Sequence, residues 1–173
     1  MSFSIKTTIR ALVAPKHRVN CPRKLWEHIL GQLDRRGERC HEAGAFLLGI
    51  GGPRRLEVTD CVFYEELEPT AYETGVCVLS GYAFAKLWAR CRERKLTVVA
   101  DVHTHPGVAK QSDSDRTNPM VASAGHVAII VPHYAIPPVE SAALGIYEYR
   151  GGHEWTNRNG NGRSEFLYVG RWS

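Results

Sequence analysis

The apolar residues of two segments recur at the spacing of one helical face, i, i+3, i+4 and i+7. These positions are Trp26, Ile29, Leu30 and Leu33 in the first segment and Phe84, Leu87, Trp88 and Cys91 in the second. The pattern predicts amphipathic helices over residues 22–36 and residues 80–95. Pro22 suits the first turn of the earlier helix and Gly37 its C-terminal end, whereas Ser80 can cap the N-terminus of the later one.

Short runs of apolar, aromatic and β-branched residues predict the strands. The segments are residues 43–50, 55–64, 76–79, 96–105, 126–131, 144–149 and 166–169. Polar connections predict loops over residues 65–74, 132–139 and 151–163, and a short helix inside the polar segment 112–124. Strands interleaved with helices favour a mixed α/β domain whose sheet is covered by helices. Two connections are short enough for hairpins, so we expect a sheet that is not wholly parallel.

The composition restricts the class of protein without changing this outline. A chain of 173 residues fits a single domain over residues 1–173, and 43% hydrophobic residues suffice for a core. The net charge is only +4 and acids interrupt the basic clusters, so we expect no nucleic-acid partner. No apolar run approaches the roughly 18 residues of a membrane span and no signal-peptide core is seen, so we expect no membrane partner and a cytoplasmic location. The five cysteines form no C-x-x-C pair and are expected to be reduced thiols.

The candidate chemistry lies where one predicted strand ends, at the sequence Asp-Val-His-Thr-His-Pro of residues 101–106. Alternate side chains of a strand share a face, so His103 and His105 project to the same side. Asp115 follows closely enough in sequence to fold back over the strand end. A His, His, Asp set with a water in the fourth place is typical of catalytic zinc sites, whereas structural zinc sites are cysteine-rich and closed by four protein ligands. Ser112 and Asp115 also have the spacing of a helix-capping pair, and the two interpretations are compatible.

These residues resemble the JAMM motif of the MPN-domain metalloproteases, zinc isopeptidases that remove ubiquitin and ubiquitin-like modifiers. Residues 103–106 (His-Thr-His-Pro) and residues 112–115 (Ser-Asp-Ser-Asp) match the H-x-H-P and S-x-x-D elements of the motif. Residues 42–49 resemble the family's Glu-x-x-Gly-x-Leu-Leu-Gly strand, with Ala45 in place of the first glycine. The resemblance covers most of residues 22–131. The compact chain with short loops looks like the small stand-alone prokaryotic members.

The resemblance implies a fold, a metal and a role for each site residue. The implied fold is a single MPN-like (cytidine-deaminase-like) α/β domain, with a mixed, mostly antiparallel curved sheet flanked by helices. The implied ligands of one zinc ion (Zn²⁺) are His103, His105 and Asp115, with Glu42 as general base and acid and Ser112 as oxyanion donor. The implied reaction is hydrolysis after the C-terminal glycine of a ubiquitin-like protein, in deconjugation or precursor processing. The implied partner is that protein or its conjugate.

The spacing of the motif leaves the third ligand open. Six residues separate His105 from Ser112, where the family commonly has seven. Asp113 therefore competes with Asp115, although Asp115 keeps the three-residue offset from Ser112. Ser114 is the corresponding rival of Ser112. Two other functions remain in competition, a non-catalytic MPN scaffold that serves only in assembly, and a metallo-amidase that acts on a small peptide-like substrate.

Four further residues near the motif have alternative interpretations. Asp101 shares the strand face of both histidines and is either a partner that orients an imidazole or a structural acid. His41 adjoins Glu42 and is expected to point to the opposite face of a strand. We expect His126 to be a buried, hydrogen-bonded histidine at the start of an apolar strand. His133 lies in a predicted loop and is not expected to line a substrate channel.

Overall fold

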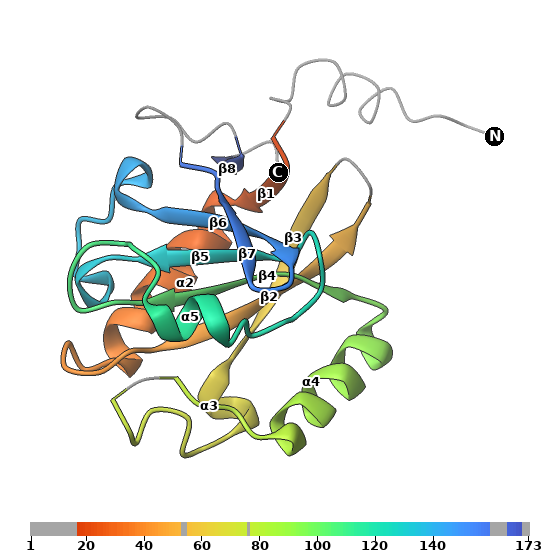
Figure 1. Ribbon diagram of the computed structural model, residues 1–173, viewed down its shortest axis with the longest axis horizontal. Coiled ribbons are helices and arrows are strands. Elements are labelled where there is room, and N and C mark those ends of the chain that lie inside the picture. The colour runs from red at the N-terminus through yellow and green to blue at the C-terminus, as the bar shows by residue number, and fades with distance from the viewer. Residues whose placement is uncertain (1–16, 53–54, 76, 160–165, 171–173) are drawn as a thin grey trace.

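The fold is built on one curled, mixed sheet of eight strands (Figure 1). It is seen in a computed structural model that describes residues 17–52, 55–75, 77–159 and 166–170. The strands are β1 (Val19–Pro22), β2 (Gly44–Gly51), β3 (Leu56–Phe63), β4 (Thr97–Thr104), β5 (Val127–Val131), β6 (Gly145–Gly151), β7 (Glu154–Asn157) and β8 (Leu167–Gly170). Their order across the sheet is β7-β6-β5-β4-β2-β3-β1-β8. The pairs β4–β5, β1–β3 and β1–β8 are parallel and the others antiparallel, so the predicted mixed sheet with an antiparallel majority is confirmed.

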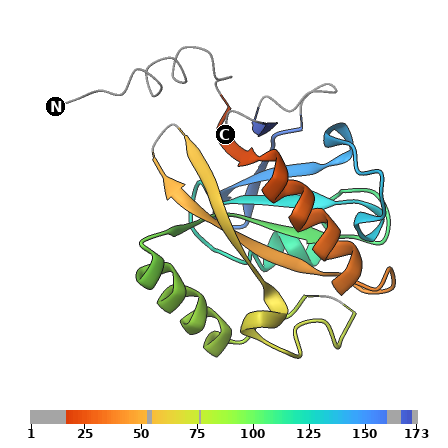
Figure 2. The ribbon, with the colours of Figure 1, turned by 180° about the vertical axis from the view of Figure 1, so that it is seen from behind.

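Helices lie on both faces of this sheet. They are α2 (Arg23–Arg36), α3 (Tyr64–Leu67), α4 (Gly81–Arg94) and α5 (Asp113–Thr117), with 3-10 turns η1 (His133–Ala135) and η2 (Ser141–Ala143). Helix α2 crosses the face seen in Figure 2, whereas α5 lies on the face seen in Figure 1. None of the helices in the described part of the chain combines the length and the apolar character that crossing a membrane requires.

The two long helices confirm the helical pattern of the sequence. Helix α2 buries Trp26, Ile29 and Leu33 against the sheet. Helix α4 begins at Gly81 and is capped by Ser80, whose side chain accepts a hydrogen bond from the Ala83 backbone at 3.3 Å. Its apolar face buries Ala83, Leu87 and Cys91, while Trp88, which the pattern places on the same stripe, is 38% exposed.

Some short elements depart from the sequence prediction. Residues 77–79 form no strand, because Val78 donates its backbone N–H to Ala71 and stays in a loop; Val76 lies outside the described residues. Strands β1 and β7 and helix α3 are not predicted. Each of the three has only four residues, too few to express a period, and β7 (Glu-Trp-Thr-Asn) lies at the sheet edge, where one neighbour is enough. All five cysteines are free, as expected.

Strand β4 is central to the sheet and positions the candidate site. It pairs with β2 on one side and β5 on the other, and its residues from Val99 onward are buried. Gly44 of β2 lies opposite His103 in this register. The segment that precedes β2 is tied to the end of β4 by two hydrogen bonds of 2.9 Å, from Ala43 N to Thr104 Oγ1 and from Thr104 N to the Ala43 carbonyl. Glu42 is therefore held beside the histidine-bearing end of β4.

Candidate metal centre

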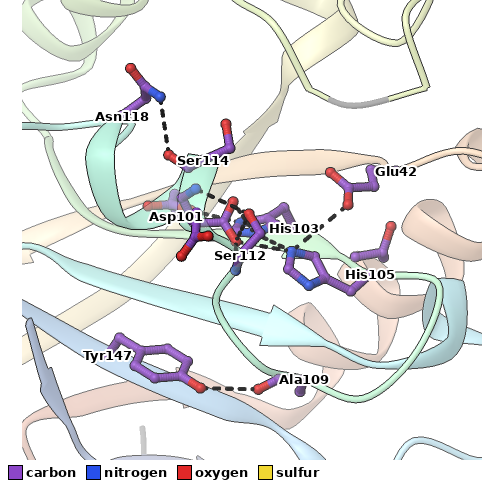
Figure 3. A network of polar contacts seen from close by, with 12 residues as sticks. Glu42, Asp101, His103, His105, Ala109, Ser112, Ser114, Asn118 and Tyr147 are labelled. Atoms are coloured by element: carbon purple, nitrogen blue, oxygen red, sulfur yellow. Dashed lines mark hydrogen bonds and ion pairs between the residues drawn. The ribbon is translucent and has the colours of Figure 1, made fainter.

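Three side chains meet where β4 ends and α5 begins. His103 Nε2 lies 3.2 Å from His105 Nε2, and the Asp115 carboxylate oxygens lie 3.5 Å from the first nitrogen and 3.2 Å from the second. One ligand atom from each of the three residues lies within 4.8 Å of the other two. Both imidazoles are buried, while the Asp115 side chain is 21% exposed. Figure 3 shows the two rings meeting close to Ser112.

This donor set fits a zinc ion. Two imidazole nitrogens and one carboxylate oxygen are ligands that zinc takes in catalytic sites, with the fourth position left to water. Donors about 2.0–2.1 Å from a tetrahedral zinc lie about 3.4 Å from one another. The imidazole nitrogens are 3.2 Å apart, and the carboxylate offers Oδ1 at 3.5 Å from His103 and Oδ2 at 3.2 Å from His105, all close to that value.

The charges around His103 favour a cation at the same place. Burial lowers the pKa of the imidazole, but the hydrogen bonds and charges of Asp101 and Asp115 outweigh it and raise the pKa of His103 to about 10. Burial acts to raise the pKa of the Asp115 carboxyl, yet His103, His105 and the Ser112 backbone hold that pKa well below its usual range. The site thus stabilises positive charge, whether it is carried by a proton or by a metal ion.

Glu42 stands at the rim of the cluster. Its Oε1 lies 3.8 Å from His105 Nε2, along the contact drawn in Figure 3, and its side chain is 16% exposed. Its backbone N–H donates to the Gly75 carbonyl at 3.1 Å, which fixes the segment that carries it. Burial raises the pKa of Glu42 more than the nearby histidines lower it. A carboxylate so placed has a proton affinity above that of an exposed glutamate.

Asp101 is a buried partner of His103. Of the two interpretations that the sequence left open, a partner that orients an imidazole and a structural acid, the contacts favour the first. Its Oδ2 lies 3.3 Å from His103 Nδ1, and its Oδ1 lies 2.6 Å from His126 Nε2. Tyr64 also donates its hydroxyl to Oδ2, at 3.4 Å. Burial acts to raise the pKa of Asp101, but the two histidines hold it below its usual range. The carboxylate therefore orients the imidazole so that Nε2 faces the cluster.

Sequence analysis predicted one further residue of this buried network and missed another. His126 is 6% exposed and hydrogen-bonded, as predicted. Tyr64 is missed, since nothing in its local pattern distinguishes it from a core aromatic. Its ring crosses β2 at Gly44, where a Cβ would stand 2.2 Å from a ring carbon, so the glycine is what allows the hydroxyl to reach Asp101.

The capping pair predicted from the sequence is present and holds Asp115. Ser112 caps α5: its Oγ accepts a hydrogen bond from Asp115 N at 3.1 Å, and Asp115 Oδ2 accepts from Ser112 N at 2.7 Å. The Ser112 hydroxyl donates to the same carboxylate oxygen at 2.8 Å. Among the described residues, the histidine cluster contains Asp115 and not Asp113. The offset from Ser112 therefore identifies the acid that meets the histidines.

The short loop between His105 and Ser112 is anchored on β6. The Tyr147 hydroxyl donates to the Ala109 carbonyl at 3.3 Å, as Figure 3 shows. Gly145 allows this approach, because a Cβ there would stand 2.1 Å from the Ala109 oxygen. These contacts let a loop of six residues deliver Asp115 to the cluster.

A cavity of about 670 Å³ opens over the cluster. Glu42, Asp101, His103, Ser112 and Asp115 belong to its lining, and so does Ser114. Side chains that sequence reasoning missed complete it, among them Cys77, Leu79, Phe84, Gln111, Met120 and Trp155. They come from distant parts of the chain, so no local motif could have indicated them.

The remaining histidines lie outside the cluster. His41 precedes β2 instead of lying in a strand, and its ring stacks on Tyr72 with centroids 5.6 Å apart. With Glu38 and Cys40 it forms a second group of possible ligands, but Glu38 and Cys40 are exposed. His133 is exposed in η1 and is not among the residues that line the cavity over the cluster.

Comparisons with known proteins give a relative and a shared fold. No known protein-family profile matches the chain. It is 25% identical over 138 residues to the probable metalloprotease y4jG of Sinorhizobium fredii, covering 79% of this chain and 85% of the relative. A protein of Desulfitobacterium hafniense with a known solution structure has the same fold, with a TM-score of 0.58 at 15% identity over 87% of this chain and 92% of that one. A His, His, Asp cluster is a suitable centre for the class in which the relative is named.

Proposed function

We propose that the protein is a zinc-dependent peptidase of the JAMM type, which hydrolyses the amide bond after the C-terminal glycine of a ubiquitin-like protein. The observation that carries the proposal is the convergence of His103, His105 and Asp115 at the end of β4, with Glu42 3.8 Å from His105. The metalloprotease name of the 25% identical relative supports the class of reaction. The JAMM motif described above supports the type and the substrate class.

In this proposal His103, His105 and Asp115 hold the zinc ion. When bound, zinc acts as a Lewis acid and lowers the pKa of a water from 15.7 to about 7. Asp101 keeps His103 in the orientation that presents Nε2, and the capping box keeps the Asp115 carboxylate over the strand end. No side chain of the protein has to form a covalent bond to the substrate.

Glu42 moves the proton. As the water oxygen bonds to the amide carbon, a proton passes from the water to Glu42, and Glu42 then delivers it to the leaving amine nitrogen as the C–N bond breaks. Its half-buried position raises the pKa of the carboxyl above that of an exposed glutamate, which suits a group that must both take and return a proton near neutral pH.

Ser112 completes the proposed machinery as the donor to the oxyanion. Its hydroxyl now donates to Asp115 Oδ2, which also accepts the Ser112 backbone N–H at 2.7 Å. The hydroxyl can therefore turn to the substrate oxygen without leaving the carboxylate unbonded. Donors of this kind are worth about 10²–10³ in rate.

The test compares Glu42→Gln with Glu73→Gln, an exposed glutamate on the loop that follows α3. The substrates are a pentapeptide that ends in Gly-Gly, joined to a lysine side chain, the same peptide joined to a small aromatic amine, and a small amide of that amine without the peptide. We expect one zinc per chain in all three proteins by elemental mass spectrometry. We expect kcat to fall by about 10²–10⁴ in Glu42→Gln alone.

Three results would contradict the proposal. Near-normal turnover by Glu42→Gln would remove its role as base and acid. A wild-type protein that takes up no zinc would favour the non-catalytic scaffold. Hydrolysis of small amides without any hydrolysis of the Gly-Gly conjugates would favour a metallo-amidase with another substrate.

A further inference from the structure

A second cavity lies next to the metal centre. It has a volume of about 810 Å³, within the range of roughly 300–1,000 Å³ that ligand sites occupy. Gln111 and Trp155 line both this cavity and the one over the metal cluster. The indole N–H of Trp155 donates to the Arg116 carbonyl at 3.1 Å and ties β7 to α5, which Figure 1 shows side by side. A molecule in the second cavity can thus extend to the scissile site.

Strand β7, the last strand of the sheet, forms one wall of the cavity. All four residues of β7, Glu154–Asn157, line it, although successive side chains of a strand point to opposite faces. Tyr147 and Arg150 of the neighbouring strand β6 line it too, so the cavity lies over the β6–β7 pair and reaches the outermost strand of the sheet. β7 is the last strand of the sheet order, so within the described residues its outer backbone groups have no neighbouring strand. Such an edge can accept an extended peptide as an added strand.

The lining of this cavity is predominantly cationic. Lys110, Arg116 and Arg150 contribute positive charges, and Glu154 contributes the single carboxylate. Arg150 is 3.4 Å from Glu148, whereas no described carboxylate forms an ion pair with Lys110 or Arg116. A cleft lined mainly by charges of one sign attracts ligands of the opposite sign, so these cations favour an anionic ligand.

Gln111 adds a donor between the two cavities. Its side-chain Nε2 is buried and has no hydrogen-bond partner within the described residues. A buried amide donor without a partner is energetically unfavourable. Because Gln111 lines both cavities, a turn of its side chain would present this donor to a carbonyl or carboxylate oxygen of a bound chain at their junction.

From these observations we infer that the second cavity binds an acidic, extended segment of the substrate as an added strand on β7. Lys110, Arg116 and Arg150 select carboxylate side chains, and Gln111 holds the chain where it enters the metal centre. This inference rests on the proposed function, because it assigns the acidic segment to the substrate that is hydrolysed. It adds a preference for acidic sequence close to the scissile bond.

The binding test uses a probe that cannot be a substrate for Gly-specific hydrolysis. The probe is a fluorescein-labelled hexapeptide, Asp-Ser-Asp-Ser-Asp-Ser, whose carboxylates share one face when it is extended, and the reference is its Asn-Ser counterpart. The proteins are the zinc-loaded wild type, the double variant Lys110→Gln with Arg116→Gln, and a control that loses the same charge, Arg23→Gln with Lys24→Gln on α2. Fluorescence anisotropy at 50 and 500 mM salt measures affinity.

We expect the acidic probe to bind the wild type and the control alike, about tenfold more weakly to the cavity variant, and more weakly at high salt. Equal binding of the acidic and amide probes, or an unchanged affinity in the cavity variant, would overturn the inference. A Gly-Gly conjugate preceded or followed by the Asp-Ser sequence should be hydrolysed faster by the wild type than by the cavity variant. Hydrolysis without this preference would overturn the inference and leave the proposed function standing. Binding without any hydrolysis would overturn the proposed function, and the cavity would remain a binding site for acidic peptides without a role in hydrolysis.

Discussion

The two halves of the metal centre are built on different principles. The strand half consists of Asp101 and His103 on β4 and of His105, which directly follows the strand; the three residues are 1%, 5% and 7% exposed. The helix half consists of Ser112 and Asp115 at the start of α5, a helix that has no buried residue. The first half is fixed by the centre of the sheet, while the second is fixed by a capping box and by the anchored loop before it.

This difference shows which contacts hold each half of the site in place. In the strand half, the sheet hydrogen bonds set the backbone, and the contacts of Asp101 with His126 and Tyr64 set the side chains. In the helix half, the same two hydrogen bonds that cap the helix also aim the ligand, so a local motif replaces the support of a core. Substitutions in the two halves should therefore change metal affinity and stability to different extents.

The largest expected effect concerns the ligand supplied by the helix half. Asp115→Ala removes a carboxylate that lies within 3.5 Å of both imidazoles, so we expect zinc affinity to fall beyond the roughly 10–100-fold that loss of an outer partner costs. Asp113→Ala is the matched control, two residues away on the same helix, and should bind zinc as the wild type does. Competition with a chromogenic chelator measures both affinities.

The same two variants also test whether Asp115 is the ligand of the helix half. If Asp113→Ala lost zinc and Asp115→Ala kept it, the shortened loop would have moved the ligand, and the capping box would hold a structural acid only.

The next effect concerns the support within the strand half. Asp101→Asn should weaken zinc binding by about 10–100-fold and destabilise the metal-free protein by about 1–3 kcal/mol, because it leaves buried imidazoles poorly paired. A second readout separates orientation from folding. At pH 8 the metal-free His103, with a pKa of about 10, is protonated, so zinc binding releases about one proton. The variant loses a neighbouring carboxylate and should release less.

Calorimetric titration of zinc in two buffers of different ionisation enthalpy measures that proton release. Equal release by the wild type and Asp101→Asn would show that Asp101 does not control the charge of His103. Leu33, a fully buried core residue on α2, offers a control for stability, since Leu33→Ala should lower the stability without changing the proton release.

The contrast between the halves also explains what the sequence could predict. The motif residues are near neighbours along the chain, so period-two alternation predicted the pairing of His103 with His105, and a capping spacing predicted the place of Asp115. The residues that support the strand half could not be predicted in this way. Tyr64 reaches Asp101 across Gly44, and Gly145 admits Ala109, through contacts between distant segments that leave no local pattern. The edge strand β7 was missed because four polar and aromatic residues do not express a strand period.

The smallest expected effect is the loss of the cap itself. Ser112→Ala removes the side-chain hydrogen bonds to Asp115 N and Oδ2 but keeps the 2.7 Å bond from Ser112 N to the carboxylate. We expect a loss of about 1 kcal/mol in the free energy of unfolding, or roughly 2–4 °C in Tm. Zinc affinity should fall less than in Asp101→Asn, because one bond still aims the ligand. Differential scanning calorimetry and chelator competition measure the two quantities, with Ser114→Ala as the control on the same turn. A loss of zinc greater than that of Asp101→Asn would mean that the helix half, despite its exposure, is the part of the centre that determines metal binding.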